Sequence, residues 1–453
     1  MNVKVQLPKF VKSVLDKFED NNFEIYIVGG AVRDVILGKI VDDWDFTTNA
    51  TPEKILKLFP EGFYDNKFGT VGVSHPSSEN PFEITTFRKE FGYSDSRRPD
   101  KVEWGKTLIE DLSRRDFTVN AMALKQIKEK KNEYQLIDEF EGQKDLEGKT
   151  IKAVGNPNER FSEDALRMMR AIRIASELNF TVEEETLEAI KKNANLINRI
   201  AKERIKEELF KLLTSSHPYE GMIIFKNSGL MTEIIPELEK TFGVEQKSPG
   251  RHHIYDVGTH LFMSLKNCKS ESPIVRLATL IHDIGKPQTY KLQDNGVVTF
   301  YNHEVVSTRI AENIADRLRF SNKEKDKFIK LVKFHQFTVD EKQTDSAVRR
   351  FIKNVGKENI QDMLDLRVAD RLGGGARETS WRLEEFKSRL IEVQKQPFTV
   401  KDLKIDGNDV MKILNIKGSP KVGEILNELF KEVVSKKIPN DKKGLLSRLE
   451  ELK

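Results

Sequence analysis

The chain contains 453 residues, of which 38% are hydrophobic and 33% charged, and its net charge is only +4. This length exceeds what one hydrophobic core normally organises and predicts about three domains, while the small net charge leaves only local basic clusters as an argument for nucleic-acid binding. No apolar window approaches the roughly 20 residues that span a bilayer, and the N-terminus lacks the features of a signal peptide. The single cysteine, Cys268, cannot form an internal disulfide. We therefore expect a cytoplasmic protein with no membrane partner.

The pattern of apolar residues changes along the chain. Residues 9–20 predict an amphipathic helix, and residues 23 to about 140 mix strand and helix patterns. The strand-like runs are FEIYIV, WDFTT, TVGVSH, FEITTF and AMALKQI, and the helix candidates are residues 31–37, 52–59 and 107–113. Beyond about residue 158 the pattern is almost wholly helical. The fold class that follows is an α/β head, with a mixed sheet and flanking helices, followed by an all-α remainder.

Two polar segments interrupt this pattern. The strongest linker signal is Lys247-Ser248-Pro249-Gly250, which separates a helical middle from a histidine-rich third part. Residues 88–105 form a basic segment that is too long for an ordinary hairpin connection.

Residues 21–50 give the first indication of chemistry. An apolar run ends in Gly29-Gly30, where a strand gives way to a helix N-terminus that can seat phosphate. Asp43 and Asp45 follow in a second extended run, and side chains two residues apart on a strand point to the same face. Paired carboxylates repel one another unless a cation lies between them, and Mg²⁺ prefers oxygen ligands. Either half alone is usually a turn or a solvated loop, but together they predict phosphoryl or nucleotidyl transfer with Mg²⁺.

Two interpretations fit the segment Arg114-Arg115-Asp116, which is followed by Asn120. It is a helix end, where arginine favours the helix dipole and asparagine caps, or it is a set of triphosphate or primer contacts in which Asp116 and Asn120 bind ribose hydroxyls. The residues alone leave both open.

The stretch SEDALRMMRAIRIAS predicts a helix with Ser162 as its N-cap. Its charged residues recur every three positions and form one surface row: Asp164, Arg167, Arg170 and Arg173. Leu166, Met169 and Ile172 form the adjoining apolar row and are expected to face a core. The arginines repel one another unless an anion compensates them, and Asp164 is the only acid within the row. A bound triphosphate or RNA backbone would fill this deficit, and a salt-bridged solvent face is the alternative.

Asp164 and Arg167 also suit base selection. Adenine and cytosine both present an exocyclic amine beside a ring-nitrogen acceptor, which an aspartate and an arginine can read together. Uracil and guanine present the reverse pattern, and each good bidentate contact discriminates by about 1–3 kcal/mol. This pair could therefore admit C and A while refusing U and G.

With these motifs the chain resembles the class II tRNA nucleotidyltransferases, which are the CCA-adding enzymes and the bacterial poly(A) polymerases. The resemblance covers about residues 20–240 densely and the rest more loosely. It rests on five motifs in order: GGAVRD, DWD, RRDFTVNAM, EDALR and KERIKEELFKLL. The family organisation implies a nucleotidyltransferase head (1–150), a helical neck and body (151–245), a further helical domain (250–380) and a basic tail (385–453).

The resemblance also implies roles for individual residues. It makes Asp43 and Asp45 the catalytic carboxylates that hold Mg²⁺. It assigns nucleotide binding to Gly29, Gly30 and Arg33 near the triphosphate, to Arg115, Asp116 and Asn120 at the ribose, and to Asp164 and Arg167 at the base. Arg170 and Arg173 would offset triphosphate charge together with Arg33. The predicted reaction is template-independent addition of C, C and A to the tRNA 3′ end from CTP and ATP.

Two segments indicate which of the related activities of this family the chain has. Enzymes that add only CC resemble shortened versions that lack most of the flexible loop, and here the segment from Arg88 to Pro99 has what looks like full length. Poly(A) polymerases usually differ where this chain has NKFGTVGVSH. An A-adding enzyme keeps the loop and stays an alternative. Trp44 lies between the two aspartates where a small aliphatic residue is commoner, and its side chain is expected to face away from the metals.

Six of the eight histidines fall between His252 and His335. The segment LATLIHDIGKP resembles the HD phosphohydrolase signature, and imidazoles with carboxylates suit a divalent transition metal, singly or as a bridged pair. The candidate ligands in this order are His260, His282, Asp283, His303, His335 and Asp370. Some such domains hydrolyse phosphoesters, so this activity is a second prediction.

Residues 385–453 are helical and rich in lysine. They form a solvated bundle or a tail that grips tRNA through its phosphates, and the family architecture favours the tail. A more distant alternative for the whole chain is an HD phosphohydrolase whose N-terminal region only binds RNA. That alternative explains the histidines but not the DWD and GGAVRD motifs.

Overall fold

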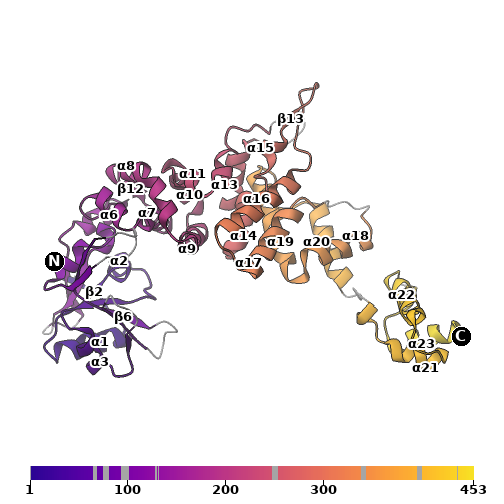
Figure 1. Ribbon diagram of the computed structural model, residues 1–453, viewed down its shortest axis with the longest axis horizontal. Coiled ribbons are helices and arrows are strands. Elements are labelled where there is room, and N and C mark those ends of the chain that lie inside the picture. Colours follow the sequence, from indigo (N-terminus) through magenta and orange to yellow (C-terminus); the bar gives the residue numbers. More distant parts are fainter. Residues whose placement is uncertain are drawn as a thin grey trace.

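The computed structural model describes residues 2–64, 69–74, 81–92, 101–127, 130, 132–246, 254–337, 343–394, 400–435 and 437–453. The molecule is elongated, with an α/β head at the N-terminal end, helical layers in the middle and a small helical unit at the C-terminal end (Figure 1). The predicted fold class, an α/β head followed by helices, is confirmed.

The head is built on an eight-stranded sheet with the order β1-β10-β9-β2-β3-β6-β5-β4. Only β3 and β6 pair in parallel, and every other pairing within this sheet is antiparallel. The central strand β2 is a fully buried apolar run, and its neighbours β3 and β6 carry β-branched and aromatic residues, which is why they were visible in the sequence. The strands are β1 (Asn2–Lys4), β2 (Ile25–Val28), β3 (Asp45–Thr48), β4 (Phe63–Tyr64), β5 (Thr70–Val73), β6 (Phe82–Thr86), β9 (Ala123–Gln126) and β10 (Glu133–Ile137).

Short helices flank this sheet. The predicted amphipathic helix is α1 (Lys9–Glu19), whose buried side chains recur at helical spacing. A capping box at Thr107 and Glu110 fixes the start of α4. The remaining head elements are α2 (Gly30–Ile36), α3 (Pro52–Leu58), α4 (Leu108–Ser113), the 3₁₀ turn η1 (Thr118–Asn120) and α5 (Gly142–Glu147).

The basic segment 88–105 contains a separate hairpin. Its strands are β7 (Arg88–Phe91) and β8 (Lys101–Trp104), which pair antiparallel outside the main sheet. The prediction that residues 88–105 are not a hairpin is therefore wrong at both ends of the segment, which pair as strands, and residues 93–100 lie outside the described residues.

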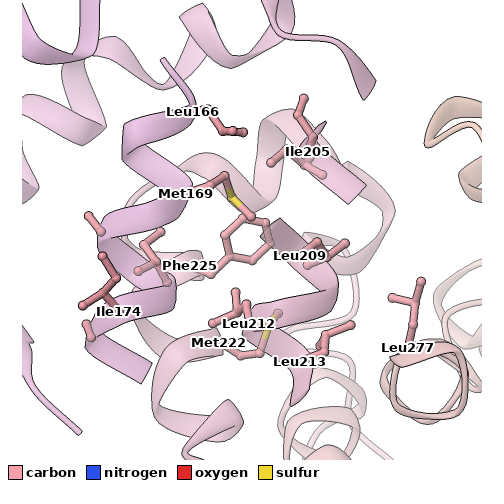
Figure 2. Close-up of a cluster of buried hydrophobic side chains, with 14 of the residues drawn as sticks. Leu166, Met169, Ile174, Ile205, Leu209, Leu212, Leu213, Met222, Phe225 and Leu277 are labelled. Atoms are coloured by element: carbon pink, nitrogen blue, oxygen red, sulfur yellow. The ribbon is translucent and has the colours of Figure 1, made fainter. Parts of the chain in front are cut away.

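The middle of the molecule is a helical layer around one apolar core. Figure 2 shows Phe225 and Met222 of one helix packed between the apolar faces of two others, which carry Leu166, Met169 and Leu209. The predicted apolar row on residues 166–172 is therefore confirmed. The elements of this layer are β11 (Thr150–Ile151), α6 (Pro157–Glu163), α7 (Leu166–Leu178), β12 (Thr181–Val182), α8 (Glu184–Asn193), η2 (Ala194–Arg199), α9 (Lys202–Thr214), α10 (Pro218–Asn227), α11 (Leu230–Ile234) and α12 (Pro236–Glu239).

One predicted boundary in this layer is wrong. Ser162 does not cap a helix but lies inside α6, where its hydroxyl donates to the carbonyl of Asn158. The chain breaks between α6 and α7 at Asp164, whose extended backbone and carboxylate, which accepts from the Leu166 N–H, start α7. The break therefore brings Asp164 to a helix junction and not to a helix face.

The third part is again helical, with one small hairpin. Its elements are α13 (Val257–Lys266), α14 (Pro273–Ile281), α15 (Lys286–Thr289), β13 (Lys291–Leu292), β14 (Val298–Thr299), α16 (His303–Arg317), α17 (Asn322–Phe334), α18 (Asp345–Val355), η3 (Lys357–Asn359), α19 (Ile360–Gly373) and α20 (Trp381–Gln394). The predicted linker at residues 247–250, with His252 and His253, lies outside the described residues.

The C-terminal unit has its own core, separate from the rest. Leu429, Leu445 and Leu449 are fully buried within it. Its elements are η4 (Val400–Asp402), α21 (Gly407–Leu414), α22 (Pro420–Val434) and α23 (Lys442–Glu451). The predicted boundary at residue 385 falls within α20, whose Phe386 packs on Phe351 of α18 and on Phe337. Among the described helices, none combines the length and apolar character that a bilayer crossing needs.

Candidate active site

The glycine turn and the acidic pair are brought together at one edge of the head sheet. Val28, the last residue of β2, pairs with Asp45, the first residue of β3. Gly29 has φ +74°, and a Cβ there would lie 3.0 Å from Oδ2 of Asp45 and 3.1 Å from Nη1 of Arg115. Glycine at this position therefore both adopts a left-handed backbone and leaves room for the carboxylate and the guanidinium.

The two aspartates do not both lie on a strand, contrary to the prediction. The strand begins at Asp45, and Asp43 lies just before it, exposed and outside any helix or strand. Between them, Trp44 is 3% exposed and belongs to the main apolar core. Its side chain thus points away from the acids, as expected.

The carboxyl group of Asp45 has a raised pKa. Burial raises its pKa to about 6, and the nearby carboxylates of Asp43 and Glu83 raise it while Arg115 lowers it. Glu83 stands beside Asp45 because β6 pairs with β3 in this register. A buried carboxylate crowded by two others is stabilised in its charged form by a cation, so this donor set fits a divalent metal such as Mg²⁺. Glu83 was not predicted, since the register that pairs it with Asp45 is not visible in the sequence.

A pocket of about 320 Å³ opens beside these carboxylates. One wall is acidic and belongs to the sheet, and the other carries arginines from the segment after α4 and from α7 and α9. The lining residues are Asp45, Phe46, Glu83, Thr85, Arg114, Arg115, Asp116, Asp164, Arg167, Arg170 and Arg204. Five guanidinium groups around one acid-edged pocket suit a polyanion that also carries divalent cations.

A hydrogen-bonded chain connects the glycine helix to the pocket. Arg33 pairs with Asp34 and donates from Nη1 to Oδ1 of Asn120 at 2.9 Å. Asn120 donates to Asp116 at 3.3 Å, and Asp116 accepts from Arg170 at 2.6 and 2.8 Å. Burial raises the pKa of Asp116, but Arg170 and Arg167 outweigh it and lower the pKa to about 2. Arg33 and Asn120 therefore position Asp116 and do not themselves line the pocket.

Arg114 and Arg115 are both held by a buried acid that was not predicted. Arg114 donates to Asp111 at 2.6 and 3.0 Å, and Arg115 donates to the other oxygen at 3.4 Å. Both arginines follow the end of α4 and both line the pocket. Arg114 therefore lies at a helix end, and the assignment of the segment to triphosphate and ribose contacts stays a prediction.

The predicted charge deficit along residues 164–173 is wrong. Arg167 pairs with Glu163 at 2.8 Å, and Arg173 pairs with Glu177 and Glu208 at 2.8 Å. Because Arg170 pairs with Asp116, every arginine of the row has a carboxylate partner. Arg167 and Arg170 line the pocket, but Arg173 does not. Two of these partners are far away in sequence, which is why the row looked uncompensated.

Asp164 and Arg167 line the same pocket, and each is fixed by another residue. Asp164 accepts from Nη2 of Arg204 at 2.9 Å, while Arg167 donates to the carbonyl of Arg114 at 2.9 Å. Arg204 was not predicted, although it belongs to the KERIKEELFKLL segment. The two side chains thus present one acceptor and one donor, which is the pattern needed to read an amine beside a ring nitrogen.

Comparisons with known proteins agree with this geometry. Three family descriptions match the chain, the poly A polymerase head domain over residues 25–152, the RNA and SrmB binding site of polymerase A over 179–242 and tRNA nucleotidyltransferase domain 2 over 298–449. The CCA-adding enzyme of Ligilactobacillus salivarius is 34% identical over 97% of this chain and 95% of its own length. That of Limosilactobacillus reuteri is 33% identical over 100% of this chain and 99% of its own length. The chain belongs to the CCA-adding enzyme family.

A solved family member has the same architecture. The crystal structure of the Bacillus stearothermophilus CCA-adding enzyme in complex with CTP is similar to this chain with a TM-score of 0.70 and 26% identity, covering 99% of this chain and 98% of the other.

A second polar cluster in this CCA-adding family member lies in its third part. Asp283 stands at its centre, with Oδ2 3.5 Å from His260 and 3.4 Å from His282, and Oδ1 3.1 Å from His303 and 3.4 Å from His335. Asp370 approaches the first two histidines at 3.3 and 3.5 Å. All six predicted ligands are therefore brought together from α13, α16, α19 and the ends of α14 and α17.

Backbone carbonyls that contact Nδ1 orient three of these histidine rings. Nδ1 of His282 contacts the carbonyl of Thr279 at 2.8 Å, and His303 and His335 make equivalent contacts with Phe300 and Val332. A protonated Nδ1 at each contact leaves Nε2 as an acceptor directed at Asp283. Two triads, His260-His282-Asp283 and Asp283-His303-His335, each bring their donor atoms within 4.8 Å of one another, which fits one ion each with Asp283 shared.

Proposed function

We propose that this protein adds C, C and A to the tRNA 3′ end from CTP and ATP, with Asp43 and Asp45 as its catalytic carboxylates. The observation that supports this most strongly is that Asp45 and Arg115 both lie beside Gly29, at a pocket edged by acids and lined by arginines. Full-length similarity to CCA-adding enzymes supports the same reaction.

Asp43 and Asp45 are proposed to hold the divalent metal, with Glu83 beside them. Bound Mg²⁺ would supply Lewis-acid chemistry, lowering the pKa of the RNA 3′-hydroxyl and neutralising the departing pyrophosphate. In the transfer step, the 3′-oxygen forms a bond to the α-phosphorus as the bond between that phosphorus and the pyrophosphate oxygen breaks. The protein contributes mainly by holding the two reactants in line.

The arginines are proposed to divide into two groups. Arg115 and Arg170 line the pocket and would face the triphosphate, with Asp116 at the ribose. Arg33, whose guanidinium is engaged by Asp34 and Asn120, would act by positioning Asp116. Arg173 is engaged by Glu177 and Glu208 and is proposed to be structural, in contrast to the sequence-based assignment.

Asp164 and Arg167 are proposed to select the base. The carboxylate of Asp164 would accept from the exocyclic amine of C or A, and the guanidinium of Arg167 would donate to the ring nitrogen. For U or G both contacts would be mismatched, and each bidentate contact discriminates by about 1–3 kcal/mol.

The decisive variant is Asp45→Ala. With tRNA that lacks its 3′ end, Mg²⁺ and labelled CTP and ATP, we expect incorporation to be abolished while tRNA binding is retained. Asp42→Ala is the matched control, since this exposed neighbour removes the same charge one residue outside the pair. Substantial incorporation by Asp45→Ala would contradict the metal assignment.

The same assay separates the related activities. Substrates that end before, within and after CC distinguish a CCA-adding enzyme, which completes all three, from an A-adding enzyme, which extends only the last. A long adenosine tract would instead indicate a poly(A) polymerase.

We also propose that the histidine cluster binds one or two divalent transition metals and hydrolyses a phosphoester. The observation that favours this is the convergence of four imidazoles, three of them oriented by backbone carbonyls, on the two oxygens of Asp283. Bound metal would supply an activated water. Metal content by elemental analysis should fall in Asp283→Ala and stay unchanged in His217→Gln, a histidine outside the cluster. Equal metal content in all three proteins would refute the site.

A further inference from the structure

A second basic pocket lies in the third part, beside the histidine cluster, where its lining residue Arg367 pairs with Asp370. It has a volume of about 490 Å³, within the range of ligand pockets, and its lining includes Arg367, Arg371, Arg382 and Trp381. These residues come from α19, from the start of α20 and from the turn between the two helices. It shares no residue with the head pocket. In Figure 1, α19 and α20 lie between the middle helices and the C-terminal unit, well along the long axis from the head.

The aromatic side of this pocket offers an exposed ring on which a flat π-system can stack. Trp381 is 60% exposed, although tryptophan is usually well covered, and the guanidinium of Arg382 lies 5.2 Å from the centre of its ring. Phe337 and Leu383 form an apolar floor, being 8% and 2% exposed. A flat π-system that stacks on the indole would cover apolar surface that now faces water.

The cationic side keeps most of its charge uncompensated. Arg367 pairs with Asp370 at 3.1 Å. Arg371 donates to the carbonyls of Arg377 and Thr379 at 3.1 and 3.4 Å, which fixes its position without neutralising it. Within the described parts of the chain, neither Arg371 nor Arg382 forms an ion pair with a carboxylate. Two positive charges, of which that of Arg371 is fixed by hydrogen bonds, beside an exposed indole match a phosphate joined to an aromatic base.

We propose that this pocket binds an unpaired nucleotide of the tRNA body, with the base stacked on Trp381 and its phosphate facing Arg371 and Arg382. The inference rests on the proposed function, because that function makes RNA the substrate while the head pocket takes only its 3′ end. Stacking on an aromatic ring tolerates any base, so the contact contributes affinity to tRNA in general and not selection of its sequence.

The test compares steady-state constants for tRNA in four proteins. Loss of one stacked base weakens binding by about tenfold, so Trp381→Ala should raise the KM for tRNA by about that factor and leave kcat and the KM for CTP unchanged. Trp381→Phe, which keeps a ring, should stay close to wild type. Ile391→Ala is the matched control, since Ile391 is 61% exposed on the same helix but outside the pocket.

A short RNA hairpin that carries only the acceptor end provides a second substrate. The defect of Trp381→Ala should disappear with this hairpin, because the hairpin lacks the body nucleotide. Equal KM values for tRNA in Trp381→Ala and wild type would overturn the proposal, as would an equal defect with both RNAs.

Binding measured by tryptophan fluorescence separates this proposal from the proposed reaction. Titration with tRNA should quench the wild type more than Trp381→Phe, whether or not any nucleotide is incorporated. A quench at Trp381 produced by CTP or ATP alone would identify a free-nucleotide site and would overturn the assignment to tRNA. Wild-type protein that binds tRNA at Trp381 but incorporates nothing would refute only the proposed reaction.

Discussion

Asp116 is a buried acid whose charge depends on a neighbouring arginine. Its pKa is lowered to about 2 because Arg170 and Arg167 outweigh the cost of burial. A carboxyl group with a depressed folded pKa stabilises the fold above its unfolded pKa, and this contribution is lost as the pH falls through the folded pKa. The shift corresponds to roughly 2 kcal/mol of the free energy of unfolding.

This gives a prediction for pH dependence. Asp116→Asn should be less stable than wild type by ~2 kcal/mol at neutral pH, and the difference should shrink as the pH falls from about 4 to about 2. Chemical denaturation of both proteins across this range measures it. A difference that stays constant down to pH 2 would show that the carboxylate contributes through packing and not through charge.

Arg204 is predicted to protect the accuracy of base selection. It holds Oδ2 of Asp164 at 2.9 Å, and the N–H of Leu166 holds Oδ1. Without the guanidinium the carboxylate can rotate, so Arg204→Ala should lower the ratio of kcat/KM for CTP to that for UTP by about tenfold, which is part of a 1–3 kcal/mol contact. Single-nucleotide incorporation measures this ratio, with exposed Glu203→Ala as the control. An unchanged ratio would leave Arg204 with a purely structural role.

The residues of the candidate site could be predicted from the sequence better than the side chains that pair with them. Gly29, Asp45, Asp164 and Arg167 were recognised because their motifs are local in the chain. The partners of Arg170 and Arg173 are Asp116, 54 residues away, and Glu208, 35 residues away. Only the packing of α7 against the head and α9 reveals that these charges are compensated.

At the scale of elements, buried strands were predicted and edge strands were missed. The runs that became β2, β3 and β6 are rich in β-branched and aromatic residues and central in the sheet, so their pattern was clear. The short, partly exposed strand β1 lies at one edge of the sheet and pairs with β10, and neither was predicted. The start of α6 had a signal, Asn156 as N-cap followed by Pro157, which was overlooked when the helix was expected to begin at Ser162.

Helices α13 and α19 approach one another closely through Gly373, and this contact places His260 near Asp370. A Cβ at Gly373 would lie 2.2 Å from Oγ and 2.6 Å from the backbone nitrogen of Ser264. We therefore expect Gly373→Ala to destabilise the protein by about 1–3 kcal/mol, as overpacking does, and to reduce metal content at the histidine cluster.

A glycine in open space provides the matched control for this prediction. Gly423 lies within α22, and a Cβ there would meet nothing within 4 Å. Gly423→Ala should therefore stabilise its helix by about 0.5–1 kcal/mol. Thermal denaturation with metal analysis of both variants tests the contrast, and equal effects of the two substitutions would show that helix propensity alone is being measured.

At the scale of the whole molecule, the sequence indicated an α/β head, helices and a basic C-terminal part in the correct order. The domain boundaries themselves stay predictions. One apolar cluster runs from Leu7 to Val393, whereas the residues from Leu403 to Leu449 form another. Composition shows where a pattern changes, but only packing shows which helices share a core.

This separation predicts that the C-terminal unit can be removed while the chemistry is kept. Because the residues from 400 onward share no core with the head, a protein that ends at Gln394 should keep its kcat for CCA addition and the thermal transition of the remaining chain.

If lysines of this unit bind tRNA phosphates, its removal should raise the KM for tRNA and reduce the slope of log Kd against log salt by about one for each phosphate that is no longer neutralised. Filter binding at several salt concentrations measures this slope. An unchanged slope would mean that these lysines are simply solvated, and tRNA affinity would then have to come from the head, the middle helices and the pocket at Trp381.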